Sequence, residues 1–418
     1  MPDVVVVGAG VAGLTAARVL AERRVDVTVI EARERIGGRT WTRDLAGAPV
    51  DMGGSWIHGP YGNPLSEVAA GFGLSTRNDG AWGTGLELFV EGSGWADAAT
   101  TTSMVAARLD WDPGEAAFAL GGDRPHREGV EWFVGDRGYP TDIAAVVRFN
   151  LDWVEGALNI GGRPDTISLL GSAAYVSHGG GNTVIDGGYR AMVDHLARGL
   201  DIRVGEPVLA IEHGVEGLVS TTLTTHRADR IIVTVPLGVL KSGSIVFDPP
   251  LPHGGAIERL AMANLEKVVF RFDRPVWPRQ RRRANFVSED RRFPTWADMS
   301  DHAGAPTIVA LYNPTATGWI EALAPADRVE PALAVLRAMT PEIPDPIEAF
   351  ATDWTGDPLS GGSYSYIPLG ATAADMRHLA RPASERLVLA GEHTVAAYFG
   401  TVHGAHVSGM RAADWATA

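Results

Sequence analysis

Apolar positions at the start of the chain follow two different spacings. Val4–Val7 is an unbroken β-branched run, which is typical of a strand buried on both faces. After a glycine-rich stretch at 8–13, helical spacing holds over 14–24, and a second apolar run over 25–30 ends at Glu31. This order of strand, turn, helix, strand and acid predicts a βαβ unit in a parallel sheet.

The rest of the chain alternates between the two spacings without a repeat. The pattern predicts helices over 98–109, 142–156, 190–200, 328–339 and from about His403, and strands over 202–209, 226–235, 264–273, 307–311 and from Leu387 to Gly391-Glu392. The stretch 78–170 carries short helical segments and no nucleotide motif, so we expect it to form an inserted helical lid. With 418 residues, the chain is long enough for two domains.

The glycine turn predicts a dinucleotide site. Gly8 permits a tight turn, Gly10 allows a pyrophosphate to approach the backbone, and Gly13 allows the helix to pack closely on the sheet. The N-terminus of the helix then faces the phosphates, and Glu31 is placed to bind a ribose hydroxyl pair. The alternative is a βαβ unit that binds nothing.

The residues after Glu31 narrow the choice of cofactor. A carboxylate on the ribose repels the extra phosphate of NADP and leaves NAD or FAD. A second glycine pair, Gly37 and Gly38, is followed by Arg39, so backbone amides and a guanidinium could neutralise the pyrophosphate from its other side. This pattern favours FAD, although an ordinary polar turn has the same composition.

Composition and charge exclude several classes of protein. Hydrophobic residues make up 45% and charged residues 21%, and no apolar run approaches the roughly 20 residues of a membrane helix. The first strand begins by residue 4, so we expect a cytoplasmic protein without a signal peptide and without a membrane partner. The net charge of −14 argues against nucleic acid and suits a cationic substrate, although solubility explains it equally well.

The absence of cysteine excludes disulfides, zinc–thiolate sites and a flavin tethered through a thioether. Any flavin is therefore expected to be held non-covalently, and no metal site is expected. Of the 36 basic residues only Lys241 and Lys267 are lysine. Because a buried lysine can change its charge and an arginine cannot, each lysine is a candidate for chemistry. We expect Lys241 to be a solvated loop cation, and the arginines between Arg274 and Arg292 to lie in a solvated loop.

Lys267 stands on the same face as Val269 in an apolar alternation. A lysine in such a strand is either a solvent-facing residue or an inward-pointing one. If it points inward, it is a candidate to hold a water beside a bound cofactor.

Six segments together resemble the flavin-containing amine oxidases, a family that includes monoamine oxidase, polyamine oxidase and lysine-specific histone demethylase. The similar motifs are E-A-R-x-x-x-G-G-R at 31–39, W-I-H-G-P at 56–60, A-D-x-I-I-V-T-V-P-L-G-V-L-K at 228–241, N-L-x-K-V-V-x-x-F-D-R at 264–274, G-S-Y-S-Y at 362–366 and G-E-H-T with T-V-H-G-A at 391–405. The run W-I-H-G-P-Y-G-N-P-L is similar to the spermine and N-acetylpolyamine oxidase branch.

The resemblance implies an α/β fold of two domains, with a Rossmann-like FAD domain and an α+β substrate domain. We expect the FAD domain to comprise 1–77, 172–245 and 382–418, and the substrate domain to comprise 78–171 and 246–381. The cofactor contacts that the resemblance implies are Gly8, Gly10, Ala12, Gly13, Glu31, Ala32, Arg33, Gly38, Arg39, Gly54, Ser55, Trp56, Val208, Trp354, Gly391, Glu392, Thr401 and Val402.

The resemblance also assigns roles around the flavin ring. It implies catalytic roles for Lys267, which would hold a water near the reactive flavin nitrogen, and for Tyr364, which would stand over the flavin face. Substrate contacts are implied at Trp56, His58, Tyr364, Tyr398 and Thr401. Thr401 stands where monoamine oxidase has its second cage tyrosine, so a cage of two tyrosines is not expected.

The implied activity is the oxidation of a polyamine such as spermine or spermidine, free or acetylated. The carbon next to a nitrogen is oxidised, the imine hydrolyses to amine and aldehyde, and dioxygen is reduced to hydrogen peroxide. Rival interpretations are a monoamine or L-amino acid oxidase and a non-catalytic FAD-binding protein. Histone demethylation is disfavoured, because the sequence shows neither an extra helical recognition domain nor a coiled-coil insertion.

Overall fold

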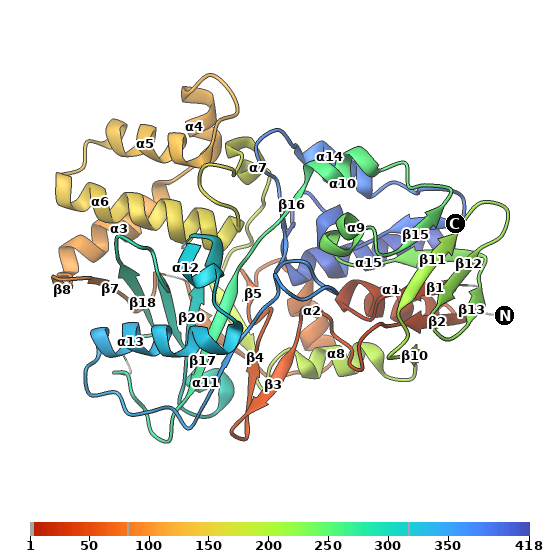
Figure 1. Cartoon of the computed structure of the whole chain (residues 1–418), viewed down its shortest axis with the longest axis horizontal. Helices are drawn as coiled ribbons and strands as arrows, with labels where there is room; N and C mark the ends of the chain where they lie inside the picture. Colours follow the sequence, from red (N-terminus) through yellow and green to blue (C-terminus); the bar gives the residue numbers. More distant parts are fainter. Residues whose placement is uncertain (1–3, 82, 279, 317) are drawn as a thin grey trace.

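The computed structural model describes residues 4–81, 83–278, 280–316 and 318–418. The protein has two lobes, each built around one large sheet (Figure 1). In the view of Figure 1 the right-hand lobe holds both ends of the chain, and the left-hand lobe carries a group of helices above its sheet.

The right-hand lobe contains a five-stranded parallel sheet in the order β10-β2-β1-β14-β23. Its strands are β1 (Val4–Val7), β2 (Val27–Ile30), β10 (Asp201–Arg203), β14 (Arg230–Val233) and β23 (Leu387–Leu389). The middle strand β1 is an unbroken apolar run and its neighbours β2 and β14 are mostly apolar, because the sheet is covered on both faces.

Alternate residues of this sheet face two different cores. Val4 and Val6 pack with α1 (Val11–Glu22) and α15 (Val402–Ala416). Val5 and Val7 pack toward the opposite face. The remaining helices on the Val4 side are α2 (Pro64–Gly71) and α8 (Arg190–Ala197), and those on the Val5 side are α9 (Leu237–Ser242), α10 (Gly254–Arg259) and α14 (Ala373–Leu379).

Smaller sheets complete this lobe and its border. One contains β11 (Val208–Glu212), β12 (Leu218–Thr221), β13 (Thr225–Arg227) and β15 (Val246–Asp248), and a second contains β5 (Ile57–His58), β6 (Thr76–Gly80) and β9 (Asn182–Ile185). Two-stranded sheets pair β3 (Thr42–Leu45) with β4 (Ala48–Asp51), and β16 (Ala261–Met262) with β22 (Ser365–Tyr366). A 3₁₀ turn, η4 (Glu392–Thr394), follows β23.

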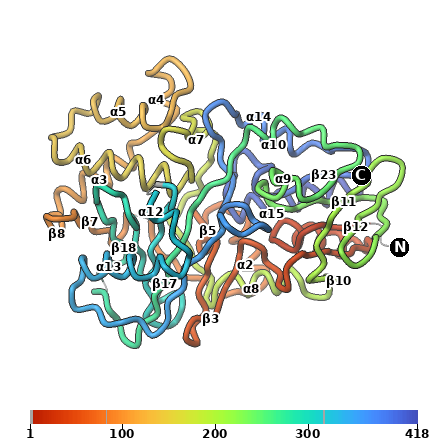
Figure 2. The backbone as a smooth tube through the Cα atoms, viewed as in Figure 1, coloured from red at the N-terminus to blue at the C-terminus, as the bar shows by residue number. Residues whose placement is uncertain are grey.

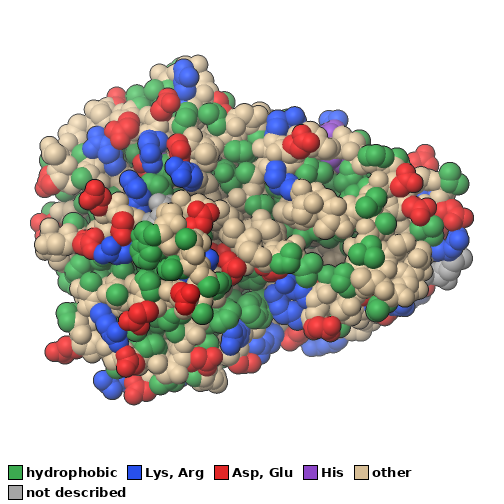
Figure 3. All heavy atoms as spheres, in the orientation of Figure 1, with side chains coloured by type: hydrophobic (Ala, Val, Ile, Leu, Met, Phe, Trp, Pro, Cys, Tyr) green, Lys and Arg blue, Asp and Glu red, His purple; other side chains and the backbone are tan. Residues whose placement is uncertain are grey.

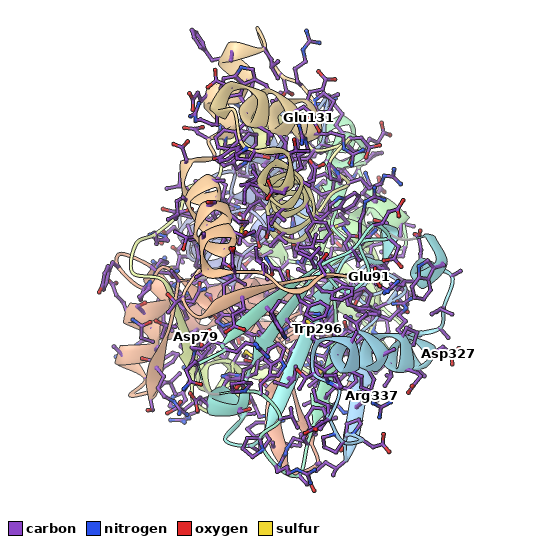
Figure 4. All side chains as sticks on the ribbon, turned by 90° about the vertical axis from the view of Figure 1, so that its left-hand side faces the viewer. Asp79, Glu91, Glu131, Trp296, Asp327 and Arg337 are labelled. Atoms are coloured by element: carbon purple, nitrogen blue, oxygen red, sulfur yellow. The ribbon has the colours of Figure 1, made fainter. Side chains whose placement is uncertain are left out.

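The left-hand lobe is built on a seven-stranded mixed sheet in the order β21-β17-β20-β19-β18-β7-β8. Its strands are β7 (Leu86–Val90), β8 (Gly94–Trp95), β17 (Glu266–Arg271), β18 (Arg283–Val287), β19 (Thr295–Asp298), β20 (Thr307–Tyr312) and β21 (Glu348–Ala351). Helix α13 (Val329–Met339) covers one face, where Trp296 is fully buried (Figure 4). Short elements around it are α11 (Ser300–Ala303), η2 (Pro314–Ala316), α12 (Gly318–Glu321) and η3 (Pro325–Arg328).

The helical group of this lobe comes from the predicted lid segment. It consists of α3 (Ala98–Asp110), α4 (Pro113–Ala119), α5 (His126–Arg137), α6 (Thr141–Phe149), the π-helix η1 (Asn150–Ile160) and α7 (Leu169–Ala173). The helix predicted over 142–156 is therefore an α-helix that continues as a π-helix and ends at Gly161, whose φ is 104°. Such π-turns are rare and are often found at functional sites.

Two predicted strands were wrong. The stretch 226–235 is two strands, because β13 pairs with β12 in the four-stranded sheet whereas β14 pairs with β1 in the parallel sheet. The stretch 202–209 is two strands, because β10 lies beside β2 whereas β11 belongs to the four-stranded sheet. Between them Pro207 has no N–H for a ladder, and Glu206 N donates to Glu31 O (2.9 Å). The four-stranded sheet also crosses the expected domain boundary at 245, since β15 pairs with β11.

The prediction that Lys241 is a solvated loop cation was wrong in one respect, because the residue is exposed but lies in the last turn of α9 and not in a loop. Its ammonium donates to the carbonyls of Ile257 (3.0 Å), Glu258 (2.8 Å) and Leu260 (2.8 Å). These are the last carbonyls of α10, so Lys241 acts as a side-chain cap for the C-terminus of that helix.

The two ends of the chain meet in the right-hand lobe (Figure 2). Helix α15 packs along α1, with Thr15 Oγ1 3.0 Å from His406 Nδ1. The contact is so close that a Cβ at Gly409 would lie 2.3 Å from Ala12 O. The last helix therefore helps to fix the first one.

The visible surface mixes both signs of charge. Acidic and basic side chains are interspersed over the face in Figure 3, with apolar side chains between them. Within the described residues, no helix combines the length and apolar character needed to cross a membrane.

Candidate functional site

A single large cavity of about 870 Å³ lies where the two lobes meet. Its lining includes the glycine turn before α1, the start of α15, the 51–56 segment and residues of the π-helix. Residues far apart in the sequence thus form one site, which joins the parallel sheet to the helical group.

The glycine turn at the end of β1 leaves open space beside the first helix. A Cβ at Gly10 would meet nothing within 4 Å, and no described side chain caps the helix there. A Cβ at Gly13 would lie 1.9 Å from Gly8 O, so close packing of helix on turn requires glycine. The uncapped amides at the N-terminus of α1 therefore face the cavity and favour an anion.

A second glycine turn lies directly against the first. Gly37 N donates to Ala9 O (2.8 Å), and Gly38 adopts a φ of 57° with its Cβ position 3.4 Å from Gly10 Cα. Both glycines line the cavity together with Arg39. Backbone amides and a guanidinium thus surround the same space as the end of α1.

Glu31 holds the first turn in place from the end of β2. Its carboxylate accepts hydrogen bonds from Ala9 N (2.7 Å) and Arg33 N (2.9 Å), and its side chain is buried at the edge of the cavity. The open space at Gly10, the uncapped amides and this fixed carboxylate fit the pyrophosphate and ribose of a dinucleotide.

Glu392 and Arg39 form a buried ion pair at the junction of the lobes. Glu392 Oε1 lies 2.9 Å from Arg39 Nη1, and the carboxylate also accepts from Gly400 N (2.8 Å) and Ser365 Oγ (2.5 Å). Burial would raise the pKa of Glu392, but Arg39, His393 and these hydrogen bonds outweigh it and keep the pKa below its usual value. The acid therefore stays ionised and ties the last 3₁₀ turn to the second glycine turn.

Lys267 points inward from β17, on the same face as Val269. Its side chain is buried, and its ammonium donates to Asp51 O (2.9 Å), Gly53 O (2.6 Å) and Ser55 Oγ (2.6 Å). Burial lowers the pKa of Lys267 to about 8, although the Asp51 carboxylate opposes the shift. The lysine thus holds the cavity-lining turn after β4 and titrates near neutral pH.

Tyr364 joins the same region to the π-helix. Its hydroxyl donates to Leu158 O, and its ring lies against Gly161 and Gly400, which have no side chain to displace it. Burial raises the pKa of Tyr364, so the hydroxyl keeps its proton. Both Tyr364 and Leu158 line the cavity.

Trp56 is fixed by a buried charged cluster on the left-hand lobe. Its indole N–H donates to Asp79 Oδ2 (2.9 Å), and the same carboxylate binds Arg283 and, at 2.7 Å, Arg282. Asp79 lies at the border of this lobe in Figure 4. Arg283 is 1% exposed, so the prediction of a solvated loop was wrong for this arginine, because β18 carries it into the interior beside Asp79. Arg274 and Arg291 are exposed, in agreement with the prediction, and Arg279 lies outside the described residues.

His58 lies opposite Asn182 where β5 pairs with β9. The imidazole Nδ1 is 2.8 Å from Asn182 Oδ1, and burial lowers the pKa of His58. Thr401 caps α15 by accepting from Gly404 N (3.0 Å). Tyr398 packs its ring on His178 (5.1 Å between centroids) and His403 (5.0 Å), which line the cavity.

The structure brings nearly all of the residues predicted from the sequence to this one cavity. Within the described part of the chain, Gly13 and Tyr398 are the predicted site residues that do not line it. Polar lining residues that sequence reasoning missed include Arg108, Asp112, Glu155, His178, Asn182 and Asn285. Of these residues, only Asp112 belongs to a recognisable sequence pattern, because Asp112-Pro113 is typical of the N-cap and first position of a helix. This pattern predicts the helix but does not predict a binding site.

Comparison with known proteins agrees with this geometry. The model of the family described as flavin containing amine oxidoreductase matches residues 11–85 and 146–416. The match begins inside the first glycine turn and covers the second one, the segment of Lys267 and the segment that carries Glu392.

Curated relatives match over nearly the whole chain. Lysine-specific histone demethylase 1 homolog 1 of Arabidopsis thaliana is 35% identical over 99% of this chain and 52% of its own length. Polyamine oxidase 4 of Oryza sativa subsp. japonica is 30% identical over 99% of this chain and 88% of its own length. The chain therefore spans about half the length of the demethylase relatives and most of the polyamine oxidase.

Solved structures share the fold. A double mutant of putrescine oxidase, redesigned in its cofactor binding, superposes with a TM-score of 0.81 at 22% identity and covers 100% of this chain and 99% of its own. The wild-type putrescine oxidase bound to putrescine gives a TM-score of 0.79 at 21% identity. Both lobes thus follow one known two-domain architecture.

Proposed function

This chain belongs to the flavin containing amine oxidoreductases, and we propose that within this family it oxidises a small di- or polyamine at a carbon next to nitrogen. Its cofactor is FAD, and the two glycine turns, Glu31 and Arg39 are the residues that fit it. Bound FAD supplies the acceptor for two electrons from the amine.

The protein's own part is to bind, orient and exclude water. Tyr364 and Trp56 form apolar walls beside the turn that Lys267 holds, and each has its polar atom tied to a protein acceptor. Rings held in this way attract a desolvated ammonium by a cation–π contact of up to about 2 kcal/mol. The three N–H groups of the Lys267 ammonium are taken by Asp51 O, Gly53 O and Ser55 Oγ, so Lys267 would fix the turn at this end of the cavity and, in its neutral form, would offer a lone pair to a proton.

The observation that carries the polyamine proposal is a pair of carboxylates in the helical part of the cavity lining. Asp112 precedes α4 and Glu155 lies on the π-helix, and both line the same cavity as Lys267 and Tyr364. A substrate with two amines could place one beside Lys267 for oxidation and the second, charged one beside Glu155, where the carboxylate would attract it. A monoamine would leave these carboxylates with their protein partners alone, which are Arg108 for Glu155 and the first amides of α4 for Asp112.

The relatives support an amine substrate and also offer a second candidate. The names of Polyamine oxidase 4 and putrescine oxidase refer to small di- or polyamines as substrates. The 35% identical relative, in contrast, is named a histone demethylase. A monomethylated lysine side chain is itself a secondary amine, so a lysine peptide is the second substrate class to test.

The proposal is tested by anaerobic reduction of the protein as purified with FAD. Putrescine, spermidine, spermine and N-acetylspermine are compared with butylamine, L-leucine and a monomethyl-lysine peptide, and bleaching of the flavin absorbance is followed. We expect the polyamines to bleach fastest. Bleaching by the peptide or by L-leucine alone would overturn the polyamine proposal, and no bleaching by any of these compounds would favour a binding-only protein.

We expect Glu155→Gln to weaken selection of the second ammonium. Glu155 pairs with Arg108 and accepts from Asn159 Nδ2 (2.9 Å), so the variant removes one negative charge and leaves Arg108 unneutralised at the cavity. KM for spermidine should rise about tenfold relative to KM for butylamine, which corresponds to ~1.4 kcal/mol. The measurement is steady-state peroxide formation with both amines.

Glu115→Gln is the matched control for this prediction. Glu115 lies on the neighbouring helix α4 and pairs with Arg137, but it is outside the described cavity lining. An equal change of the KM ratio in both variants would mean that overall charge, not Glu155, selects the second ammonium.

A further inference from the structure

The last turn of the π-helix η1 lies between the cavity and two other segments of the chain. In a π-helix each carbonyl accepts from the amide five residues further on, so the carbonyls of the last turn lack a partner within the helix. Gly161 N donates to Gly156 O (2.9 Å) and closes the helix. The carbonyls of Ala157 and Leu158, which follow, therefore need donors from elsewhere.

Asn313, which directly follows β20, supplies one of these donors. Its Nδ2 donates to Ala157 O (3.1 Å) and Gly161 O (3.3 Å), and the residue is 4% exposed. The orientation of the amide is set by Thr315, whose N (3.0 Å) and Oγ1 (2.7 Å) both donate to Asn313 Oδ1. Asn313 is thus fixed as a donor to the end of the π-helix.

The neighbouring carbonyl is held by a ring in the wall of the amine site. The Tyr364 hydroxyl donates to Leu158 O. Gly161 packs against the same ring, since a Cβ there would lie 2.7 Å from Tyr364 Cε2. Asn313 and Tyr364 therefore bind adjacent carbonyls of one turn, so the place of the ring depends on the turn that Asn313 fixes.

The first turn of the π-helix is held in the same manner. His126 Nε2 donates to Leu151 O (2.8 Å), and Asn285 Nδ2 donates to Asn150 Oδ1 (2.5 Å). Donors from α5, from β18 and from the end of β20 therefore bind the two ends of one helix. Glu155 lies between these ends and keeps one place in the cavity lining.

We propose that Asn313 is a positioning residue that sets which length of amine substrate the site accepts. By fixing the last turn of the π-helix, it sets the separation between the Tyr364 ring, beside which one amine is oxidised, and Glu155, which attracts the second ammonium. The proposal rests on the proposed function for the nature of the substrate. A diamine that matches this separation reaches both groups at once, and a shorter or longer one loses one of the two contacts.

Asn313→Leu tests the selection of substrate length. Leucine has a similar volume but no N–H for Ala157 O, so the last turn of the helix loses its fixed place. Kinetics are measured with the diamines of three to six carbons, which include putrescine and cadaverine. We expect the wild type to prefer one length, and kcat/KM for this diamine relative to the next longer one to fall about tenfold in the variant, through KM rather than kcat. A wild type without a preferred length, or an unchanged profile in the variant, would overturn the proposal.

Lys241→Met is the matched control, because Lys241 also donates to carbonyls at the end of a helix but does not line the cavity within the described structure. It should keep the length profile of the wild type. Tyr364→Phe and the double variant Asn313→Leu/Tyr364→Phe complete a double-mutant cycle. Once the Tyr364 hydroxyl is removed, Asn313→Leu should change the length ratio by less than about threefold. Additive effects of the two substitutions would overturn the proposal, because Asn313 would then not act through the shared turn.

Hydrogen exchange of the holoenzyme measures the helix directly, without a substrate. We expect the amides of 156–161 to exchange about tenfold faster in Asn313→Leu and at the wild-type rate in Lys241→Met. Thr315→Val removes the hydroxyl that orients the amide and keeps Asn313 itself, so it should show a smaller change of the same sign. If the leucine variant does not fold, Thr315→Val serves for both measurements.

The two measurements separate this inference from the proposed function. Unchanged exchange at 156–161 in both variants would overturn the role of Asn313 even if polyamines bleach the flavin. Conversely, faster exchange in a protein that no amine reduces would uphold the role of Asn313 in the helix and reject the proposed function.

Discussion

Replacing Lys267 by methionine is expected to slow amine oxidation by about 10²-fold, the size of effect seen when one preorganised donor is removed from an active site. Methionine fills the same volume but leaves Asp51 O, Gly53 O and Ser55 Oγ without their ammonium partner. FAD should stay bound, since both glycine turns are untouched. Stopped-flow absorbance measures flavin reduction under nitrogen and reoxidation in air.

Lys241→Met is the matched control for this substitution. Lys241 also donates to three oxygens, but they are carbonyls of α10, and the residue does not line the cavity within the described structure. The Lys241→Met variant should be somewhat less stable than the wild type, but its rates of flavin reduction and reoxidation should be unchanged. Wild-type rates in Lys267→Met would remove Lys267 from the mechanism.

The charge of Lys267 should also appear in the pH dependence. With a pKa of about 8, the side chain is an ammonium below that pH and a neutral amine above it, where the Ser55 hydroxyl can donate to it. A buried cation repels a cationic substrate, so we expect kcat/KM to rise through about pH 8. Comparison with Lys267→Arg, which keeps its charge throughout, separates this rise from the titration of the substrate. A wild-type profile that superposes on that of the arginine variant would contradict the assignment.

Glu31→Ala is expected to weaken FAD retention by about 30- to 100-fold, or ~2–3 kcal/mol. The substitution removes the proposed ribose contact and leaves Ala9 N and Arg33 N without the acceptor that shapes the turn. The ratio of flavin to protein absorbance after gel filtration measures the loss.

Glu34→Ala is the control for FAD retention, because Glu34 is exposed, lies three residues further along and is outside the described cavity lining. It should retain FAD as the wild type does. Full loading of Glu31→Ala would contradict the ribose assignment.

The parts of the site that the sequence predicts are those in which a local pattern dictates the backbone. Gly8, Gly10 and Gly13 have their places because of turn geometry and close packing, and Glu31 follows from the spacing of two strands. These constraints act within about 30 residues, so periodicity and turn chemistry are enough to find them. The inward direction of Lys267 follows in the same way from its alternation with Val269.

The parts that the sequence does not predict depend on contacts between distant segments. Asn182 meets His58 only because β9 pairs with β5, and Arg283 is buried only because β18 brings it to Asp79. Glu155 lines the cavity through a π-helix, whose register a 3.6-residue period does not anticipate. Such placements are set by tertiary pairing, and no local composition marks them.

The packing of the last helix along the first one has a consequence for how the protein is made. A ribosome delivers the glycine turn first, but Glu392, Thr401 and the helix that braces α1 are synthesised several hundred residues later. For most of its synthesis, a nascent chain therefore contains the first glycine turn but lacks the later residues of the FAD-binding site. We therefore expect FAD to be loaded only after α15 has been synthesised, and cells starved of riboflavin should accumulate apoprotein.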